Sequence, residues 1–266
     1  MRRQRPRPDK PSTRAWHGKP RHATRRPDTD RILLFGVHAV EAALANPKRT
    51  VVRLLATENA AHRLAPLLAK RGLTPEDASP RDLDRLLGPD AVHQGVALEA
   101  EPLPPTGLDE VSLEGILLVL DQVTDPQNVG AALRSAAAFG AAGLVLTERH
   151  SPPLQGVLAK AASGALDVVP VILVKNLAQA LAELGELGFM RVGLAEEATE
   201  ALEAAPLARP LALVLGAEGK GLRQLTKEHC DRLCRISTQS AFASLNVSNA
   251  AAIALHWASL RAQRTG

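Results

Sequence analysis

The sequence predicts an α/β protein in two domains: a small α/β domain over residues 31–100 and a larger one with a mostly parallel sheet over residues 113–266. In the larger part, apolar runs alternate with segments of helical spacing, a pattern that favours parallel strands with helices on both faces. Its first run, residues 116–120, is apolar at every position, as expected of a strand buried on both faces. A proline-rich stretch over residues 101–112 predicts a linker between the two domains.

The overall composition excludes several classes of protein. Of the 266 residues, 45% are hydrophobic and 23% are charged, which is enough apolar material for two modest domains. No stretch reaches the roughly 18 apolar residues of a membrane span, and the Arg- and Pro-rich start lacks the apolar core of a secretory signal. The two cysteines, Cys230 and Cys234, exclude a disulfide scaffold and suit a reducing compartment. We therefore expect a cytoplasmic protein with no membrane partner.

Residues 1–30 carry the excess of positive charge. Ten basic and three acidic residues give this segment a formal charge of +7, so the remainder carries −3 of the total of +4. Five prolines and almost no apolar side chains predict a disordered tail. Such a tail fits a flexible arm that contacts RNA phosphates; a solubilising extension and an organelle transit peptide are the alternatives. Aromatic residues make up only 2% of the chain, which argues against a base-stacking platform.

The small domain shows three strand patterns and three helix patterns. The first helix stops at the breaker pair Asn46-Pro47, and the second stops at Gly72. We expect strands at residues 32–36, 51–56 and 95–99, and helices at residues 37–45, 60–70 and 80–87.

The larger domain continues this alternation to the end of the chain. We expect strands at residues 116–120, 143–146, 168–174, 189–194, 211–215 and 233–236, and helices at residues 129–139, 153–164, 177–187, 222–229 and 247–261. Ligands of a doubly wound sheet bind beyond the carboxyl ends of its strands. The loops that follow the apolar strands are therefore the places where a site is expected.

The first such loop runs from Asp121 to Gly130 and opens a helix. Asp125 followed by Pro126 is typical of a helix N-cap, and a capped helix start by itself explains the pattern. The functional interpretation is that Asn128 and Arg134 both point back toward the strand ends, where a ligand would bind.

The second loop, Gly216-Ala217-Glu218-Gly219-Lys220-Gly221, has three glycines within six residues. Glycine lets the backbone approach a ligand closely, although a tight strand-to-helix turn explains the composition equally well. The spacing matches neither the phosphate loop nor the dinucleotide fingerprint, which disfavours an ATP or nicotinamide enzyme.

The third segment, from Ser244 to Ala250, is typical of a helix N-cap followed by small residues. Together the three segments offer polar side chains that could meet at one site at the strand ends, namely Asn128, Arg134, Glu218, Ser244 and Asn246. No metal is expected, because Cys230 and Cys234 lack the further ligands that zinc needs. His38 and His93 are interpreted as structural.

Taken together, the three segments resemble the three motifs of the SpoU/TrmH branch of the SPOUT RNA methyltransferases. The residues that carry the likeness are Leu120-Asp121 through Gly130 with Arg134, then Leu215 through Leu222, then Ile236 with Ser244 through Ser248. Lys160 through Ala165 looks like the family's intervening segment. Residues 33–100, through Phe35–Val40 and His93–Ala97, are similar to the family's ribosomal-protein-like substrate-binding domain. This layout looks most like the 23S rRNA guanosine-2'-O methyltransferase group.

The resemblance implies a deep trefoil knot in the C-terminal domain, which a hydrophobic pattern does not reveal. It implies S-adenosylmethionine as cofactor, bound around Gly216, Gly219, Ile236 and Leu245. It also implies a homodimer with the site near its interface, and RNA rather than DNA as substrate. Asn249 and Ala252 depart from the family pattern, in which an apolar residue is usual at the first position and Gly is frequent at the second; neither change removes a catalytic group.

By the same likeness, Arg134 stands at the ribose 2'-OH and the neighbouring phosphate. A guanidinium is a poor base, so we expect it to stabilise developing negative charge and to hold the phosphate. Asn128, Glu218, Ser244 and Asn246 would orient Arg134, the ribose and the cofactor. A tRNA ribose methyltransferase and a non-catalytic RNA-binding assembly factor are the alternatives. The separate small domain favours rRNA, and the intact polar set favours catalysis.

Overall fold

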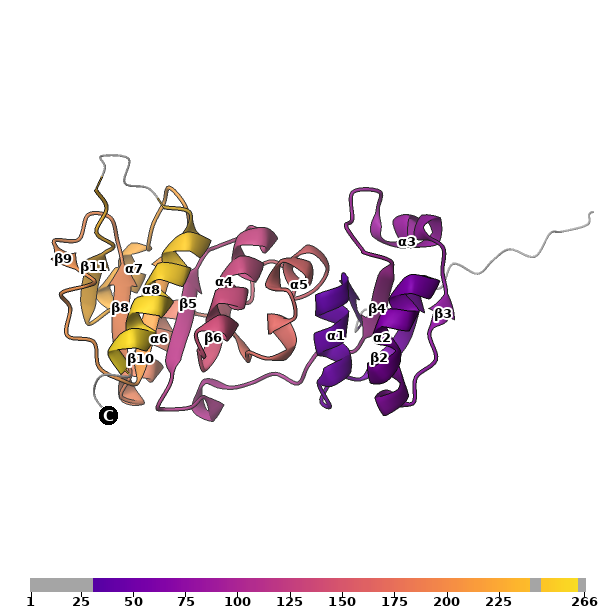
Figure 1. The fold of residues 1–266 in the computed structure, drawn as a ribbon. Coiled ribbons are helices and arrows are strands. Elements are labelled where there is room, and N and C mark those ends of the chain that lie inside the picture. The colour runs from indigo at the N-terminus through magenta and orange to yellow at the C-terminus, as the bar shows by residue number, and fades with distance from the viewer. Residues whose placement is uncertain (1–30, 240–244, 263–266) are drawn as a thin grey trace, which may run out of the picture.

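The computed structural model describes residues 31–239 and 245–262, which form two lobes (Figure 1). The predicted tail and Ser244 lie outside the described residues. The N-terminal lobe contains a four-stranded sheet in the order β1-β4-β2-β3, in which β4 pairs antiparallel with β1 and β2. Its elements are β1 (Ile32–Phe35), α1 (Val37–Ala45), β2 (Val51–Ala56), α2 (Glu58–Arg71), β3 (Glu76–Asp77), α3 (Pro80–Leu87) and β4 (Val96–Ala100).

Different helices cover the two faces of this small sheet. Leu54 of β2 belongs to the main core cluster, together with Leu64 of α2 and Val40 of α1. The next residue, Leu55, belongs to a separate cluster with Leu83 of α3. Because successive strand residues point to opposite faces, α1 and α2 cover one face and α3 covers the other.

The C-terminal lobe is built on a seven-stranded sheet in the order β7-β6-β5-β10-β8-β11-β9. Every pairing between these strands is parallel, as the alternating pattern predicts. The strands are β5 (Ile116–Asp121), β6 (Gly143–Thr147), β7 (Val171–Val174), β8 (Met190–Leu194), β9 (Glu200–Ala201), β10 (Leu211–Gly216) and β11 (Arg232–Arg235). The helices are α4 (Pro126–Ala138), α5 (Gly156–Ala162), α6 (Leu177–Glu186), α7 (Gln224–Glu228) and α8 (Val247–Ala262), with short 3-10 turns η1 (Leu108–Glu110) and η2 (Ala165–Asp167).

The central strand β5 is buried on both faces. Ile116, Leu118 and Leu120 belong to the cluster that also holds the buried residues of α4, α5 and α8. Leu117 and Val119 belong to the cluster that holds those of α6. The sheet is therefore the middle of three layers, with α4 and α8 side by side on one face in Figure 1.

The strand order reverses between β5 and β10. After β5 the chain moves outward through β6 to β7, and it then returns to β8 on the far side of β10. A doubly wound sheet binds its ligand outside the carboxyl ends of the strands at such a point. Because the predicted first and second loops follow β5 and β10, the topology places them next to each other.

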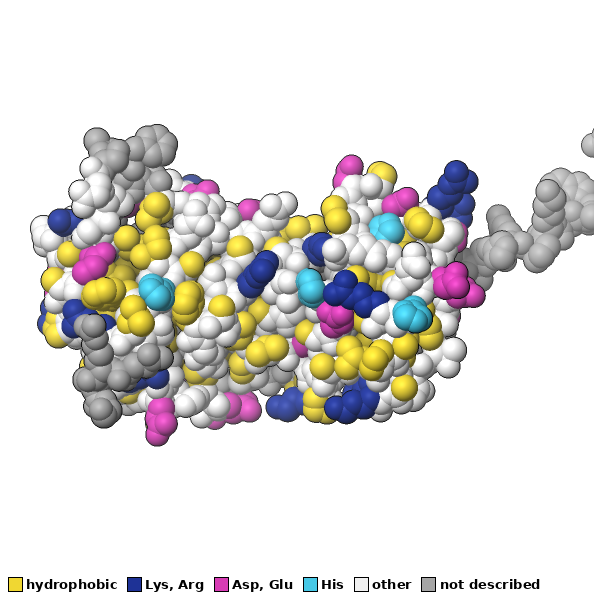
Figure 2. All heavy atoms as spheres, in the orientation of Figure 1, with side chains coloured by type: hydrophobic (Ala, Val, Ile, Leu, Met, Phe, Trp, Pro, Cys, Tyr) yellow, Lys and Arg dark blue, Asp and Glu magenta, His cyan; other side chains and the backbone are white. Residues whose placement is uncertain are grey.

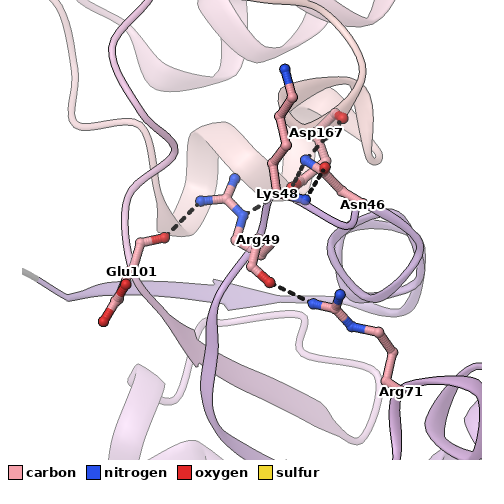
Figure 3. A network of polar contacts seen from close by, with 6 residues as sticks. All are labelled: Asn46, Lys48, Arg49, Arg71, Glu101 and Asp167. Atoms are coloured by element: carbon pink, nitrogen blue, oxygen red, sulfur yellow. Dashed lines mark hydrogen bonds and ion pairs between the residues drawn. The ribbon is translucent and has the colours of Figure 1, made fainter.

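A buried polar network joins the two lobes (Figure 3). Arg49 is only 2% exposed, and its Nε donates to Asp167 Oδ1 at 2.9 Å. Asn46 Nδ2 donates to the same oxygen at 3.0 Å, and Arg49 Nη1 donates to the Glu101 carbonyl at 3.0 Å. Arg71 donates to the Arg49 carbonyl. The main hydrophobic cluster also runs through both lobes, so they pack as one unit.

Three predicted elements are clearly shorter than expected, among them the helix predicted over residues 222–229, which is reduced to α7; two short strands were not expected. The helix predicted over residues 153–164 is reduced to α5, because Ser163 and Gly164 have positive φ angles of 51° and 97°. The strand predicted over residues 168–174 begins only at Val171, after the turn η2. The two-residue strands β3 and β9 are too short to leave an apolar pattern. No described helix has the length and apolar character to span a membrane.

Candidate active site

A cavity of about 340 Å³ lies at the carboxyl ends of β8, β10 and β11. Its walls come from the residues at and after the ends of these strands, with one residue of α7 and the start of α8. They are Leu194, Ala195, Glu196, Glu197, Leu215, Gly216, Ala217, Glu218, Gly219, Lys220, Gly221, Lys227, Arg235, Ile236, Ser237, Thr238, Leu245, Val247 and Ala250. The cavity thus lies at the carboxyl ends of the strands, but on the side of β10 that faces β8 and β11 rather than between β5 and β10.

The loop from Gly216 to Gly221 folds tightly back on itself at the wall of this cavity. A Cβ on Gly216 would lie 2.1 Å from the carbonyl carbon of Gly221, so a larger residue does not fit there. The amide of Gly221 donates to the carbonyl of Ala217 at 2.8 Å and closes the turn. The result is a stretch of backbone with few side chains, which a ligand can approach closely.

The carboxylate of Asp121 fixes the chain just after this loop. It is fully buried, and its Oδ1 accepts from Arg223 Nε at 2.7 Å. Its Oδ2 accepts from the Arg223 amide at 3.1 Å and from Thr226 Oγ1 at 2.7 Å. Three donors satisfy the buried charge. The end of β5 is thereby tied to the segment that follows the glycine loop.

Three of the predicted side chains meet beside the cavity; we call Asn128, Glu218 and Asn246 the rim cluster. Asn246 Nδ2 donates to Glu218 Oε1 at 2.6 Å and to Asn128 Oδ1 at 2.9 Å. Asn128 Nδ2 donates to Glu218 Oε1 at 3.1 Å, and the amide of Val247 donates to the same oxygen at 3.3 Å. One carboxylate therefore connects all three predicted segments.

Local capping positions two members of the rim cluster. Asp125 accepts from the Gln127 amide at 3.1 Å and starts α4, which presents Asn128 in its first turn. Asn246 precedes α8, and its Oδ1 accepts from the Ser248 amide at 2.9 Å. The capping and functional interpretations are therefore compatible, because the caps hold the helix starts at the cavity.

Arg134 does not join the rim cluster within its own chain. It lies six residues beyond Asn128, about 600° of helical rotation, so it faces a direction about 120° away. Its side chain is exposed and makes no hydrogen bond or ion pair with the described residues. The fifth predicted catalytic residue, Ser244, lies outside the described residues.

The four predicted cofactor residues, Gly216, Gly219, Ile236 and Leu245, all line the cavity. The sequence analysis missed Glu196 and Glu197, which line it from the end of β8. The sequence signal that could have found them is their position directly after a strand, but none of the three family motifs includes these residues. Lys227 of α7 donates a short hydrogen bond to Glu197. This bond holds the pKa of the Glu197 carboxyl below its usual value.

A doubly wound sheet with a cofactor-sized cavity, a polar rim and a second lobe defines a group-transfer enzyme with its own substrate-binding part. The chain belongs to the SpoU rRNA Methylase family, whose model matches residues 115–256. A second model, described as RNA 2'-O ribose methyltransferase substrate binding, matches residues 33–106. The matches fall on the two lobes, in the order that the sequence motifs predict.

Individual relatives agree with this assignment. The 23S rRNA (guanosine-2'-O-)-methyltransferase RlmB of Ralstonia nicotianae is 41% identical over 231 residues, which are 84% of this chain and 93% of that protein. RlmB of Pseudomonas putida is 39% identical over 233 residues, with the same coverage of 84% and 93%. The SpoU methyltransferase AviRb from Streptomyces viridochromogenes, solved with AdoMet, has a TM-score of 0.77 and 23% identity, covering 90% of this chain and 92% of that one. The structural match shows a shared fold.

Proposed function

We propose that this enzyme transfers the methyl group of S-adenosylmethionine to the ribose 2'-OH of a guanosine in 23S rRNA. The rim cluster carries the proposal, because it brings three separate segments into contact beside a cavity. The RlmB proteins named above are 23S rRNA (guanosine-2'-O-)-methyltransferases by name, and their similarity to this chain covers 93% of their length. Such an enzyme acts where ribosomes are assembled, which agrees with the expected cytoplasmic location.

The cavity suits S-adenosylmethionine in its mixture of surfaces. Leu194, Leu215 and Ile236 offer apolar contacts for a flat ring system, while the glycine loop offers backbone donors and acceptors. The charged lining is mixed: Glu196 and Glu197 supply carboxylates, while Lys220, Lys227 and Arg235 supply cations, and Lys227 pairs with Glu197. A volume of about 340 Å³ is in the range of small-molecule sites. The bound cofactor supplies an electrophilic methyl group; the remaining functions fall to the chain.

The protein must orient the ribose and assist loss of the hydroxyl proton. Glu218 and the two Asn side chains of the rim cluster hold hydrogen-bonding atoms in a fixed arrangement beside the cavity. Arg134, which the described chain leaves without a polar partner, stabilises negative charge on the ribose oxygen and holds the neighbouring phosphate. Ser244 belongs to the same set through its motif. Orientation by these groups removes much of the entropic barrier.

We further propose that the enzyme is a homodimer formed through α8. This helix is apolar around most of its surface, and its exposed residues Asn249, Ile253, His256 and Leu260 follow the 4-3-4 spacing of a packing seam. Ile253 is 41% exposed and Leu260 is 43% exposed. Self-complementary packing around a two-fold axis would bury this stripe against a second copy.

The dimer also explains the position of Arg134. Arg134 faces away from the rim cluster of its own chain. In the proposed dimer it would complete a site whose rim cluster belongs to the second copy. Mixing Arg134→Ala chains with Glu218→Gln chains tests this arrangement. One of the two sites in a mixed dimer then keeps both residues, so activity returns to a fraction of the wild-type rate. Failure of the mixture to regain activity would place Arg134 at its own cluster.

The defining experiment measures transfer of labelled methyl groups to unmodified 23S rRNA and, in parallel, to unmodified tRNA. Mapping by resistance to alkaline cleavage identifies a 2'-O-methylated ribose. We expect label at one guanosine of 23S rRNA. Label in tRNA would support the proposed reaction but show that the substrate is tRNA rather than 23S rRNA. Cofactor binding without label in either RNA would indicate a ribosomal particle as substrate, and absence of cofactor binding would support a non-catalytic factor.

A further inference from the structure

Basic and histidine side chains form a band that crosses from one lobe to the other, outside the cavity. Figure 2 shows Lys, Arg and His side chains following one another from the region over α4 to that over α1 and α2. We define the basic band by four residues of these helices and of α5, namely Arg134 on α4, Lys160 on α5, His38 on α1 and Arg63 on α2. The His38 side chain is 60% exposed and that of Arg63 is 52% exposed.

The first two members lie beside one helix crossing. A Cβ on Gly130 of α4 would lie 2.5 Å from the Leu158 carbonyl and 2.6 Å from the Ala161 Cβ, so this position touches α5. Arg134 lies four residues further along α4 and therefore on the same face. Lys160 is next to Ala161 on α5. Arg134 and Lys160 therefore belong to two helices that pack against each other.

Lys160 carries the band across the junction between the lobes. Its aliphatic stem lies over Gly36, where a Cβ would be 2.6 Å from Lys160 Cδ. Its Nζ donates to Gln94 Oε1 at 2.7 Å, and the same oxygen accepts from the Val37 amide at 3.1 Å. Gln94 is a neutral partner, and no described carboxylate forms an ion pair with Lys160. The ammonium charge therefore remains uncompensated at this surface.

The N-terminal lobe continues the band around a single carboxylate. Glu41 accepts from His38 Nδ1 at 3.0 Å through Oε2 and from Arg63 Nε at 3.1 Å through Oε1. Arg63 donates to Glu41 through Nε alone, and its remaining guanidinium N–H groups make no bond to a described residue. Glu41 fixes both side chains on one face, and it also lowers the local positive charge.

We propose that the substrate RNA leaves the methyl-transfer site at Arg134 and runs along the basic band, with its phosphates held by Lys160 and Arg63. This inference rests on the proposed function, whose substrate path it specifies. A row of cations without aromatic platforms suits a phosphate backbone rather than exposed bases. Because the lobes are joined by buried contacts, the band is a fixed track rather than two tethered patches.

The test compares RNA binding and turnover of the double variant Lys160→Gln/Arg63→Gln with the wild type, using unmodified 23S rRNA transcript. Each phosphate contact to a single strand contributes about 0.7 to the slope of log affinity against log salt. We expect that slope to fall by about 1.4 and KM for RNA to rise about tenfold, while kcat at saturating RNA stays within about twofold. Calorimetric binding of S-adenosylmethionine should be unchanged.

The matched control is Arg81→Gln. Arg81 is exposed on α3, which covers the opposite face of the small sheet, and it has no polar partner among the described residues. This variant removes one positive charge, where the double variant removes two, and it should leave the RNA slope, KM and kcat unaltered. A loss in Arg81→Gln about half of that in the double variant would show a general charge effect and overturn the track.

The variant Glu41→Gln should change RNA affinity in the opposite direction. Removing this carboxylate frees Arg63 and raises the charge of the band, so RNA affinity should increase about threefold or more at low salt. If RNA affinity is unchanged in both Glu41→Gln and the double variant while the enzyme still methylates 23S rRNA, the proposed track is wrong but the proposed function is not. If KM then rose only with ribosomal particles, the band would contact a protein of the particle. A wild type that binds cofactor without methylating RNA would instead refute the proposed function.

Discussion

Replacement of Asp167 by Ala tests whether the junction between the lobes is part of the fold. The side chains of Asp167 and Arg49 are 2% and 1% exposed, and one carboxylate oxygen accepts from both Arg49 and Asn46. The variant leaves a buried guanidinium whose only remaining acceptor among the described residues is the Glu101 carbonyl. Breaking a buried pair by removing one partner costs about 3–5 kcal/mol. That penalty is comparable to a large part of the stability of a typical domain.

Urea unfolding measures this effect. With a slope of about 2–3 kcal/mol per molar urea, a loss of about 4 kcal/mol lowers the midpoint by roughly 1–2 M. Because the main hydrophobic cluster runs through both lobes, we expect one transition that shifts as a whole. Asp90→Ala is the control, since Asp90 is exposed and has no polar partner among the described residues.

A second variant distinguishes the loss of the ion pair from the cost of leaving one buried charge unpaired. Replacing both partners, in Arg49→Met/Asp167→Leu, removes the unpaired charge and should recover most of the stability lost in Asp167→Ala. A midpoint for Asp167→Ala within about 0.3 M of that of the wild type would refute the reasoning. It would mean that water or another acceptor reaches Arg49 and that the lobes do not depend on this contact.

Four further variants or treatments test other parts of the structure. Glu218→Gln replaces a charged acceptor with a weaker one, so kcat should fall about tenfold or more with nearly normal cofactor affinity by calorimetry. Ile253→Glu puts a charge on the exposed stripe of α8, and light scattering should then give the mass of a monomer. Deletion of residues 1–30 should flatten the salt dependence of RNA binding without changing kcat. Burial raises the pKa of the Cys230 thiol to about 12, so it stays protonated at pH 8 and mass spectrometry should find it alkylated much more slowly in the native than in the unfolded protein.

The elements with a strong local signal were predictable from the sequence. The apolar run of β5 and the breakers after α1 and α2 are properties of a few adjacent residues. The same is true of the glycine loop, whose tight turn depends on the close approach of Gly216 to Gly221. The family resemblance then ordered the three segments and indicated four cofactor residues, all of which line the cavity. The trefoil knot stays a prediction of that resemblance, because local patterns do not encode how a chain is threaded.

The contacts between distant residues were not predictable from one sequence. Arg49 and Asp167 are 118 residues apart, and each alone looks like an ordinary surface charge. The end of α5 was also missed, because Ser163 in a left-handed conformation carries no distinctive sequence signal. Arg134 illustrates the opposite case. Its motif position implied a place at the site, yet helical geometry turns it away from Asn128, and the proposed dimer would reconcile the two.

The segment from α5 to η2 connects these observations, although it contributes no residue to the cavity. Lys160 reaches Gln94 of the N-terminal lobe, and Asp167 holds Arg49. Between them, Gly164 lies so close to α1 that a Cβ would be 2.8 Å from that of Ala42. The same segment packs against α4, which carries both Asn128 and Arg134. Its residues therefore have to satisfy both lobes at once. The distance between α1, which carries His38 of the basic band, and the helix that bears Arg134 is set by this packing rather than by the linker.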